Sequence, residues 1–115
     1  DAALARVAER LAVGYLAPEG TTEWAIASIV ALRPIPFTEA AERSWRDTYD
    51  AEACSDLGGA AGHAETELGG RTVHIATCGG LIIHHVRLTT PSVLIAITST
   101  RGGGYGQRVL EALGP

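Results

Sequence analysis

The sequence feature that most constrains the fold is a series of two-residue turn signals between stretches rich in β-forming residues. Gly69-Gly70 and Gly79-Gly80 are adjacent glycines, and such pairs readily adopt the positive φ angles that a tight hairpin turn needs. Thr90-Pro91 marks a third turn. These signals predict an antiparallel β-meander whose strands cover residues 64–68, 71–78, 81–88 and 92–98.

A two-residue turn at Gly79-Gly80 also predicts the register of the two strands that it joins. Counting outward from the turn places Ile75 opposite His84 and His74 opposite His85. Because side chains alternate between the faces of a sheet, most aliphatic residues of the meander then share one face. We expect this face to be the core, and its members are Val73, Ile75, Ile82, Val86, Leu88, Val93, Ile95 and Ile97.

Two further elements are predicted in the first third of the chain. Residues 2–16 are expected to form an amphipathic helix, because their apolar side chains recur at spacings of three and four: Leu4, Val7, Leu11 and Tyr15. Residues 24–32 are mostly apolar and end before Arg33-Pro34, which indicates a buried strand, although their alanines leave a helix as the alternative.

The largest side chains belong to a helix predicted after Pro36, with Thr38 as its N-cap. One face of this helix is expected to pack inward and comprises Phe37, Ala41, Trp45, Thr48 and Tyr49. The other is expected to face water and comprises Glu42, Arg43, Arg46 and Asp47. Glycine-rich residues 57–63 and 101–106 predict loops, and residues 107–113 a short last helix.

The predicted fold class is therefore α+β, with helices packed on an antiparallel meander in the order α-β-α-β-β-β-β-α. A chain of 115 residues with 46% hydrophobic content is expected to form a single domain, residues 1–115, around one core.

Cys54 and Cys78 are the only cysteines of the chain. They could form a disulfide, remain as buried thiols or supply half of a metal site; their separation excludes the local Cys-x-x-Cys pattern. We predict the disulfide, because small exported domains commonly use one to supplement a limited core. It would bring the end of the Trp45 helix beside the Gly79-Gly80 turn and stabilise the fold by about 3.5 kcal/mol in the chain-entropy model.

Charge and hydropathy exclude some partners. The formal net charge is -4 and the arginines are scattered singly, so no basic stripe for nucleic acid is present in the sequence. No apolar run approaches the roughly 20 residues of a membrane helix, so membrane attachment is expected only through an anchor outside this chain. The first residue is Asp1, which we interpret as the start of a trimmed or mature product, and this start allows for a lost leader. The absence of Lys, Asn and Met suggests a high-GC bacterium.

The histidines are the main candidates for a metal site. His74 and His85 would be cross-strand neighbours that could hold Zn²⁺ or Cu²⁺ if a third ligand such as His63 approached. The alternative, which we adopt, is that they are partly exposed strand histidines with ordinary hydrogen bonds, so no metal and no cofactor is predicted. His84 is expected on the core side, neutral and hydrogen-bonded.

No catalytic residues are predicted. The serines lack a GxSxG elbow, and the cysteines are expected to be oxidised. Residues 102–106 match neither GxGxxG nor GxxxxGK[ST]. Glu65 and Glu67 share one face of a strand, and their place beside a glycine-rich loop indicates a solvated edge.

The segments AERSWRDTYDAEACSDLGG and GGRTVHIATCGG place Trp45 on a helix, Cys54 shortly after it and Cys78 at the end of a strand. Over residues 37–113 this arrangement resembles bacterial surface lipoproteins and extracytoplasmic sensor-type domains, in particular the extracellular sensor domains of mycobacterial Ser/Thr kinases. The resemblance implies export and this architecture. Those kinase domains carry two disulfides and a polar central cleft, whereas this chain has two cysteines in all.

These observations predict a non-enzymatic extracytoplasmic domain, secreted or anchored at the cell surface, that binds a small ligand or a partner protein. One alternative is a metal-dependent or hydrolytic enzyme that uses His74, His85 and His63. Another is a structural dimerisation module, which would gain support if residues 92–98 formed an uncovered sheet edge able to pair with a second copy.

Overall fold

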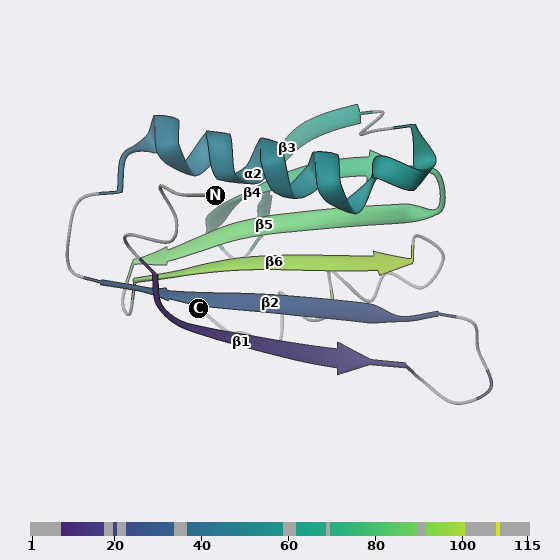
Figure 1. Ribbon diagram of the computed structural model, residues 1–115, viewed down its shortest axis with the longest axis horizontal. Helices are drawn as coiled ribbons and strands as arrows, with labels where there is room; N and C mark the ends of the chain where they lie inside the picture. The colour runs from purple at the N-terminus through teal and green to yellow at the C-terminus, as the bar shows by residue number, and fades with distance from the viewer. Residues whose placement is uncertain are drawn as a thin grey trace.

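The described part of the chain folds into one antiparallel sheet with a helix across it (Figure 1). The computed structural model describes residues 8–17, 20, 23–33, 37–58, 62–68, 70–89, 92–100 and 108. The strands are β1 (Ala8–Leu16), β2 (Ala25–Leu32), β3 (Gly62–Leu68), β4 (Arg71–Cys78), β5 (Leu81–Thr89) and β6 (Ser92–Thr100). Their order in the six-stranded sheet is β1-β2-β6-β5-β4-β3. Between β2 and β3 come helix α2 (Glu39–Ala53) and the 3-10 turn η1 (Ser55–Leu57).

The predicted meander is confirmed, together with its register. His74 pairs with His85 and Ile75 with His84, as the two-residue turn requires. The pairs that flank the three turn signals are Leu68 with Arg71, Cys78 with Leu81, and Thr89 with Ser92. Gly79 has a φ angle of 53°, in the left-handed region that favours glycine. Local turn chemistry therefore determines this half of the sheet.

The prediction of a helix over residues 2–16 is wrong for its described part, because residues 8–16 form strand β1. Apolar side chains at Leu11, Val13 and Tyr15 also have the period of two of a strand, and β1 pairs along its length with β2. Residues 2–7 lie outside the described residues. The described order is β-β-α-β-β-β-β, a mixed α+β arrangement that differs from the expected one at its start.

Several other predicted segments have clear outcomes. The strand expected over residues 24–32 is confirmed as β2. The loop expected over residues 57–63 is shorter than predicted, since η1 extends to residue 57 and β3 begins at residue 62. The last helix expected over residues 107–113 lies outside the described residues apart from Arg108, as does the loop expected over residues 101–106.

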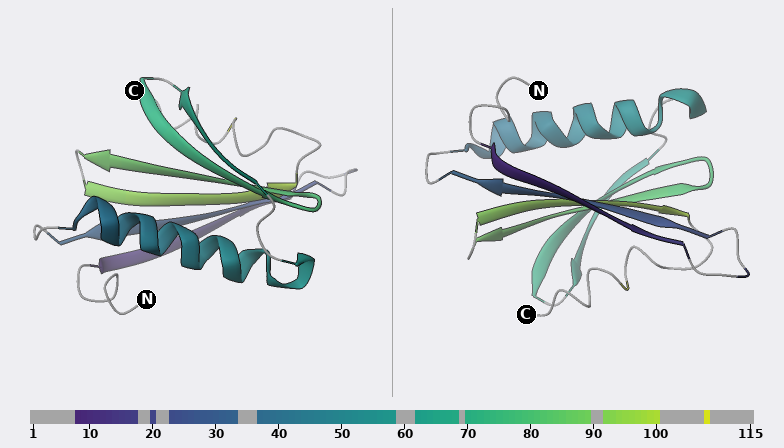
Figure 2. Two further views of the ribbon diagram at one scale, coloured as in Figure 1. Left: turned by 90° about the horizontal axis from the view of Figure 1, so that it is seen from above. Right: turned by 60° about the horizontal axis from the view of Figure 1, so that its bottom comes forward.

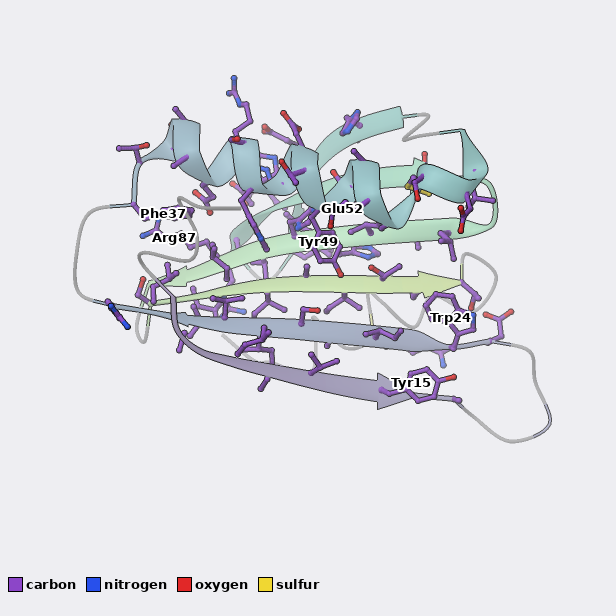
Figure 3. The ribbon with its side chains drawn as sticks, in the orientation of Figure 1. Tyr15, Trp24, Phe37, Tyr49, Glu52 and Arg87 are labelled. Atoms are coloured by element: carbon purple, nitrogen blue, oxygen red, sulfur yellow. A yellow bond between two sulfur atoms is a disulfide. The ribbon has the colours of Figure 1, made fainter. Side chains whose placement is uncertain are left out.

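Both faces of the sheet carry a buried apolar cluster. The aliphatic face predicted from the meander is largely buried and also includes Ala25 of β2, although three of its predicted members are only half-buried: Ile75, Ile82 and Leu88. The opposite face, not expected to be a core, packs against α2 through Val30, Leu32, Phe37, Trp45, Leu94 and Ala96. Figure 2 shows α2 across this face of the twisted sheet. In Figure 3 Tyr49 points from α2 toward the strands, while Phe37 and Arg87 lie together near the start of the helix.

Helix α2 begins as predicted, but one of its flanks is covered rather than open to water. Thr38 is the N-cap, and its Oγ1 accepts a 3.1 Å hydrogen bond from the backbone N–H of Ala41. Arg46, expected to face water, is 8% exposed, whereas Thr48, expected to pack inward, is exposed. The reason is that β3, β4 and β5 extend past the apolar stripe of the helix and enclose the flank that carries Arg46.

Strand β6 lies between β2 and β5, so it is not the uncovered edge on which the dimerisation alternative depended. Within the described residues the two edges of the sheet are β1 and β3. Strand β1 exposes the side chains of Leu11, Val13 and Tyr15. No helix among the described residues is long and apolar enough to cross a membrane.

Candidate functional site

The centre of the candidate site is a buried pair formed by Asp50 of α2 and His85 of β5. The Nε2 atom of His85 lies 2.7 Å from Oδ1 of Asp50, and the two side chains are 2% and 4% exposed. Because an ionised carboxylate only accepts hydrogen bonds, the N–H of His85 is the donor. The distance is that of a charge-assisted hydrogen bond, and burial removes competition from water. The pair therefore fixes the later half of α2 on the sheet.

Two aromatic side chains of α2 hold the imidazole of His85 in place. The rings of Trp45 and Tyr49 lie edge-on to it, with centroid distances of 5.2 and 5.3 Å and interplanar angles of 73° and 84°. The hydroxyl of Tyr49 is in turn hydrogen-bonded to Oγ1 of Thr98 at 3.1 Å. The Nδ1 atom of His85 is buried without a hydrogen-bond partner among the described residues. His85 is thus a rigid, enclosed group, not the partly exposed histidine expected.

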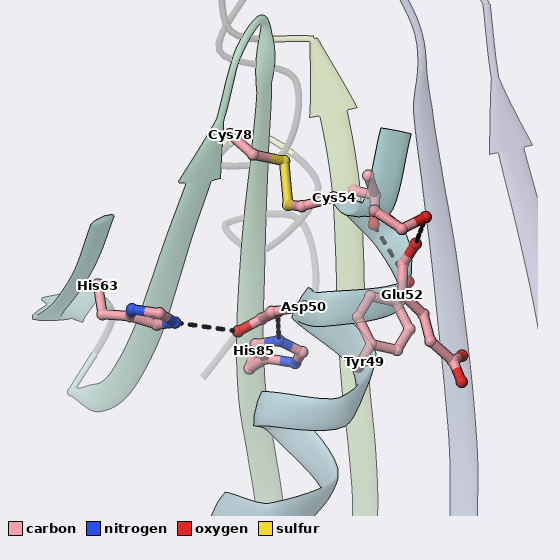
Figure 4. Close-up of a disulfide and its surroundings, with 9 residues drawn as sticks. Tyr49, Asp50, Glu52, Cys54, His63, Cys78 and His85 are labelled. Carbon is pink, nitrogen blue, oxygen red and sulfur yellow. Dashed lines mark hydrogen bonds and ion pairs between the residues drawn. A yellow bond between two sulfur atoms is a disulfide. The ribbon is translucent and has the colours of Figure 1, made fainter. Parts of the chain in front are cut away.

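His63 of β3 approaches the second oxygen of Asp50. Its Nε2 atom lies 3.8 Å from Oδ2, and the His63 side chain is 59% exposed. Figure 4 shows Asp50 between the two histidines, with His63 on one side and His85 on the other. One oxygen of Asp50 is therefore committed to the buried pair, while the other is directed toward an accessible side chain.

A cavity of about 310 Å³ lies beside this pair, between α2 and strands β3, β4 and β5. Helix α2 contributes Arg43, Arg46, Asp47 and Asp50 to its wall. The strands contribute His63, Glu65, His74 and His85. Such a dense set of titratable and charged groups around one hollow distinguishes this surface from the apolar clusters on both faces of the sheet.

His74 of β4 is a neutral member of the cavity wall near pH 7. Burial lowers its pKa from the ordinary value of 6.5, and the positive charge of Arg46 lowers it further. Glu65 opposes this shift, and its Oε1 atom lies 3.5 Å from Nδ1 of His74. The net direction is downward, so the imidazole presents one donor and one acceptor to the cavity instead of a charge.

His84 projects from the other face of β5, away from the cavity. It is 4% exposed, and burial, with a smaller effect from His85, lowers its pKa from 6.5. The expected neutral state is consistent with this direction. We expected His84 to be hydrogen-bonded, but its Nδ1 atom has no hydrogen-bond partner among the described residues.

Cys54 and Cys78 form a disulfide, as the sequence predicts. The Cα atoms are 5.8 Å apart, and the Sγ atoms are bonded. Cys54 ends α2, and its N–H donates to the carbonyl oxygen of Asp50. Leu57 lies against the predicted turn, since a Cβ added at Gly79 would come within 3.2 Å of it. The disulfide thus fixes the end of α2 one turn beyond Asp50 (Figure 4).

The three histidines proposed as metal ligands do share one cavity. His63, His74 and His85 all line it, yet in the described ranges no three His, Cys, Asp or Glu side chains are arranged to hold a metal ion. Sequence reasoning missed Asp50 and Arg46. The sequence did contain a signal for both residues. Arg46 and Asp50 lie one and five residues after Trp45, so they share one flank of the helix beside its buried stripe.

Comparisons of the chain with protein-family models, with curated proteins and with solved structures find no match.

Proposed function

We propose that this protein is a non-enzymatic, extracytoplasmic binding domain that holds a small polar ligand in the cavity between α2 and strands β3–β5. The observation that carries the proposal is the cavity itself, about 310 Å³ in volume and lined by eight charged or titratable side chains. Its size is at the lower end of the range of small-molecule sites. Its walls are preorganised by the Asp50–His85 hydrogen bond and by the nearby disulfide.

The enclosure of His85 favours binding over catalysis. A general base needs a nitrogen or oxygen within reach of its substrate. In His85, Nε2 is bonded to Asp50 and Nδ1 is buried. The pair therefore serves to position the cavity wall, and a ligand meets the more accessible side chains around it, such as His63.

The disulfide supports the extracytoplasmic location, because such bonds persist in oxidising compartments. We propose that the domain belongs to a lipoprotein or membrane-anchored protein of the sensor type that its Trp45, Cys54 and Cys78 arrangement resembles. The reading frame upstream of Asp1 tests this. An export signal or an anchor is expected there, and an initiating Met directly before Asp1 without a leader would contradict export.

Ligand binding is tested by a thermal-shift screen of small polar metabolites, followed by calorimetry of the compounds that raise the melting temperature. His74→Trp places a large ring in the cavity wall and is expected to abolish binding of a genuine ligand. Val13→Trp adds the same ring at an exposed position on β1, at the other edge of the sheet, and is the matched control. Binding that survives His74→Trp would place the ligand elsewhere.

The metal-dependent alternative keeps one specific observation in its favour, the shared cavity of His63, His74 and His85. Metal analysis of protein purified without a histidine tag decides it. A stoichiometric transition metal that is lost in His74→Ala would replace the binding proposal with this alternative. Light scattering after size-exclusion chromatography separately tests for a homodimer or a complex with a partner protein.

A further inference from the structure

Arg46 is a buried charge whose expected partners are engaged elsewhere. Glu42 and Asp50 lie one turn before and one turn after it on α2, at spacings that normally form helix ion pairs. Glu42 instead approaches Arg87 of β5, with 3.7 Å between Oε2 and Nη1, and Asp50 is bonded to His85. Among the residues that the structure describes, no carboxylate lies within 4.0 Å of the Arg46 guanidinium.

The burial of Arg46 makes this isolation costly. The residue is 8% exposed, and removing a charge from water without a partner is unfavourable in proteins. Buried charges are for that reason normally paired. Arg46 lines the cavity, and its charge contributes to the lowered pKa of His74 on the facing strand. The unpaired charge is thus directed at the space where a ligand would lie.

The chemistry of the wall narrows the ligand class. A guanidinium presents a planar fork of N–H donors that matches the two oxygens of a carboxylate or phosphate. The exposed side chains of Asp47, Glu65 and Arg43 line the same cavity, so its rim carries both signs of charge and suits a ligand with one anionic group better than a polyanion. A ligand with one anionic group and several hydrogen-bond donors could bind the Arg46 guanidinium through the anionic group and donate hydrogen bonds to the two carboxylates.

We propose, on the basis of the binding function above, that the cavity takes a small molecule with a single oxyanion group, which Arg46 binds, while Asp47 and Glu65 accept hydrogen bonds from the donors of the ligand. The amino acids and small hydroxy acids have this chemistry through a carboxylate, and monophosphate esters have it through a phosphate.

The experiment measures melting temperature and affinity with L-serine, glycolate, inorganic phosphate and glycerol phosphate, with glycerol and choline as probes that lack an oxyanion. We expect a carboxylate or a phosphate probe to bind. Comparison of the two carboxylates with the two phosphates identifies which oxyanion the cavity prefers. Arg46→Met is expected to weaken that binding at least about tenfold, as loss of a charge-assisted hydrogen bond predicts. Arg46→Lys keeps the charge without the fork and is expected to give an intermediate loss. Arg33→Met, an exposed arginine that does not line the cavity, is the charge-matched control and should leave binding unchanged.

A second readout covers the case in which Arg46 is structural. If Arg46 is an unpaired charge awaiting a ligand, Arg46→Met should raise the melting temperature of the ligand-free protein. Arg87→Met should lower it, because Arg87 donates to the carbonyl oxygen of Phe37 and pairs with Glu42. A ligand-free Arg46→Met that melts well below the wild type would overturn the inference. So would a cavity ligand without an oxyanion, although the binding function itself would stand. If no small molecule occupies the cavity, both proposals fail.

Discussion

Asp50 and His85 are joined by a 2.7 Å hydrogen bond although 35 residues separate them in the sequence. The bond connects α2 to β5, and the rings of Trp45 and Tyr49 enclose it. It therefore couples the stability of the helix to the shape of the cavity, because Asp50 belongs to both.

Removal of the Asp50 carboxylate is expected to destabilise the protein markedly. Asp50→Ala leaves the imidazole of His85 buried without its partner, which should lower the free energy of unfolding by about 3 kcal/mol. Urea denaturation followed by circular dichroism measures the change. Asp47→Ala, an exposed acid on the same helix, is the control and should change it by less than about 0.5 kcal/mol. Equal losses in the free energy of unfolding for the two variants would show that the Asp50–His85 hydrogen bond does not stabilise the fold specifically.

The disulfide is expected to contribute more to stability than any single hydrogen bond. In the chain-entropy model, opening the loop between Cys54 and Cys78 lowers the free energy of unfolding by about 3.5 kcal/mol. The double variant Cys54→Ser/Cys78→Ser should show this loss in urea denaturation. Reductant added to the wild type should reproduce it and leave the double variant unaffected. A wild type whose unfolding is the same with and without reductant, while mass spectrometry shows the thiols reduced, would contradict the prediction.

The meander could be predicted in detail because its information is local. Two-residue turns fix register by counting, so the opposition of His74 and His85 followed directly from Gly79-Gly80. The disulfide was predicted on other grounds, because the chain has two cysteines and small exported domains commonly use one such bond.

Strand β1 could not be predicted in the same way. Spacings of three and four at Leu11 and Tyr15 satisfied a helix, while Val13 between them satisfied a strand equally well. The decision came from pairing with β2, which the turn-like residues 18–22 between the two segments do not specify by themselves. Periodicity alone was ambiguous because both patterns fit.

The candidate site was only half predictable. The histidines were identified from their strand positions, but Arg46 and Asp50 were not, because a helical wheel assigns polar residues to water by default. The helical wheel fails here because strands β3–β5 cover the flank of α2 that carries these two residues. That coverage depends on how the sheet twists against the helix, which sequence spacing does not encode.

The N-cap of α2 offers a prediction confined to local structure. Thr38→Ala removes the acceptor for the backbone N–H of Ala41, and the free energy of unfolding should fall by about 1 kcal/mol. Ser44→Ala, at an exposed interior position of the same helix, should be neutral or slightly stabilising because alanine is the better helix former. Urea denaturation of both variants measures the difference. A loss in Ser44→Ala as large as in Thr38→Ala would contradict the capping role.

Stability is expected to fall as the pH drops through the range in which histidines titrate. The pKa values of His74 and His84 are lowered from 6.5 in the folded protein, chiefly by burial. Between the folded value and 6.5 the unfolded chain binds more protons, so this stability is fully present above 6.5 and is lost below it, until the folded pKa is reached. Urea denaturation from about pH 8 to about pH 5 should show the decline, above the range in which carboxylates dominate. His84→Leu and His74→Gln should each make the decline shallower, and the double variant should be the least sensitive. An identical decline in all three variants and the wild type would assign it to other groups.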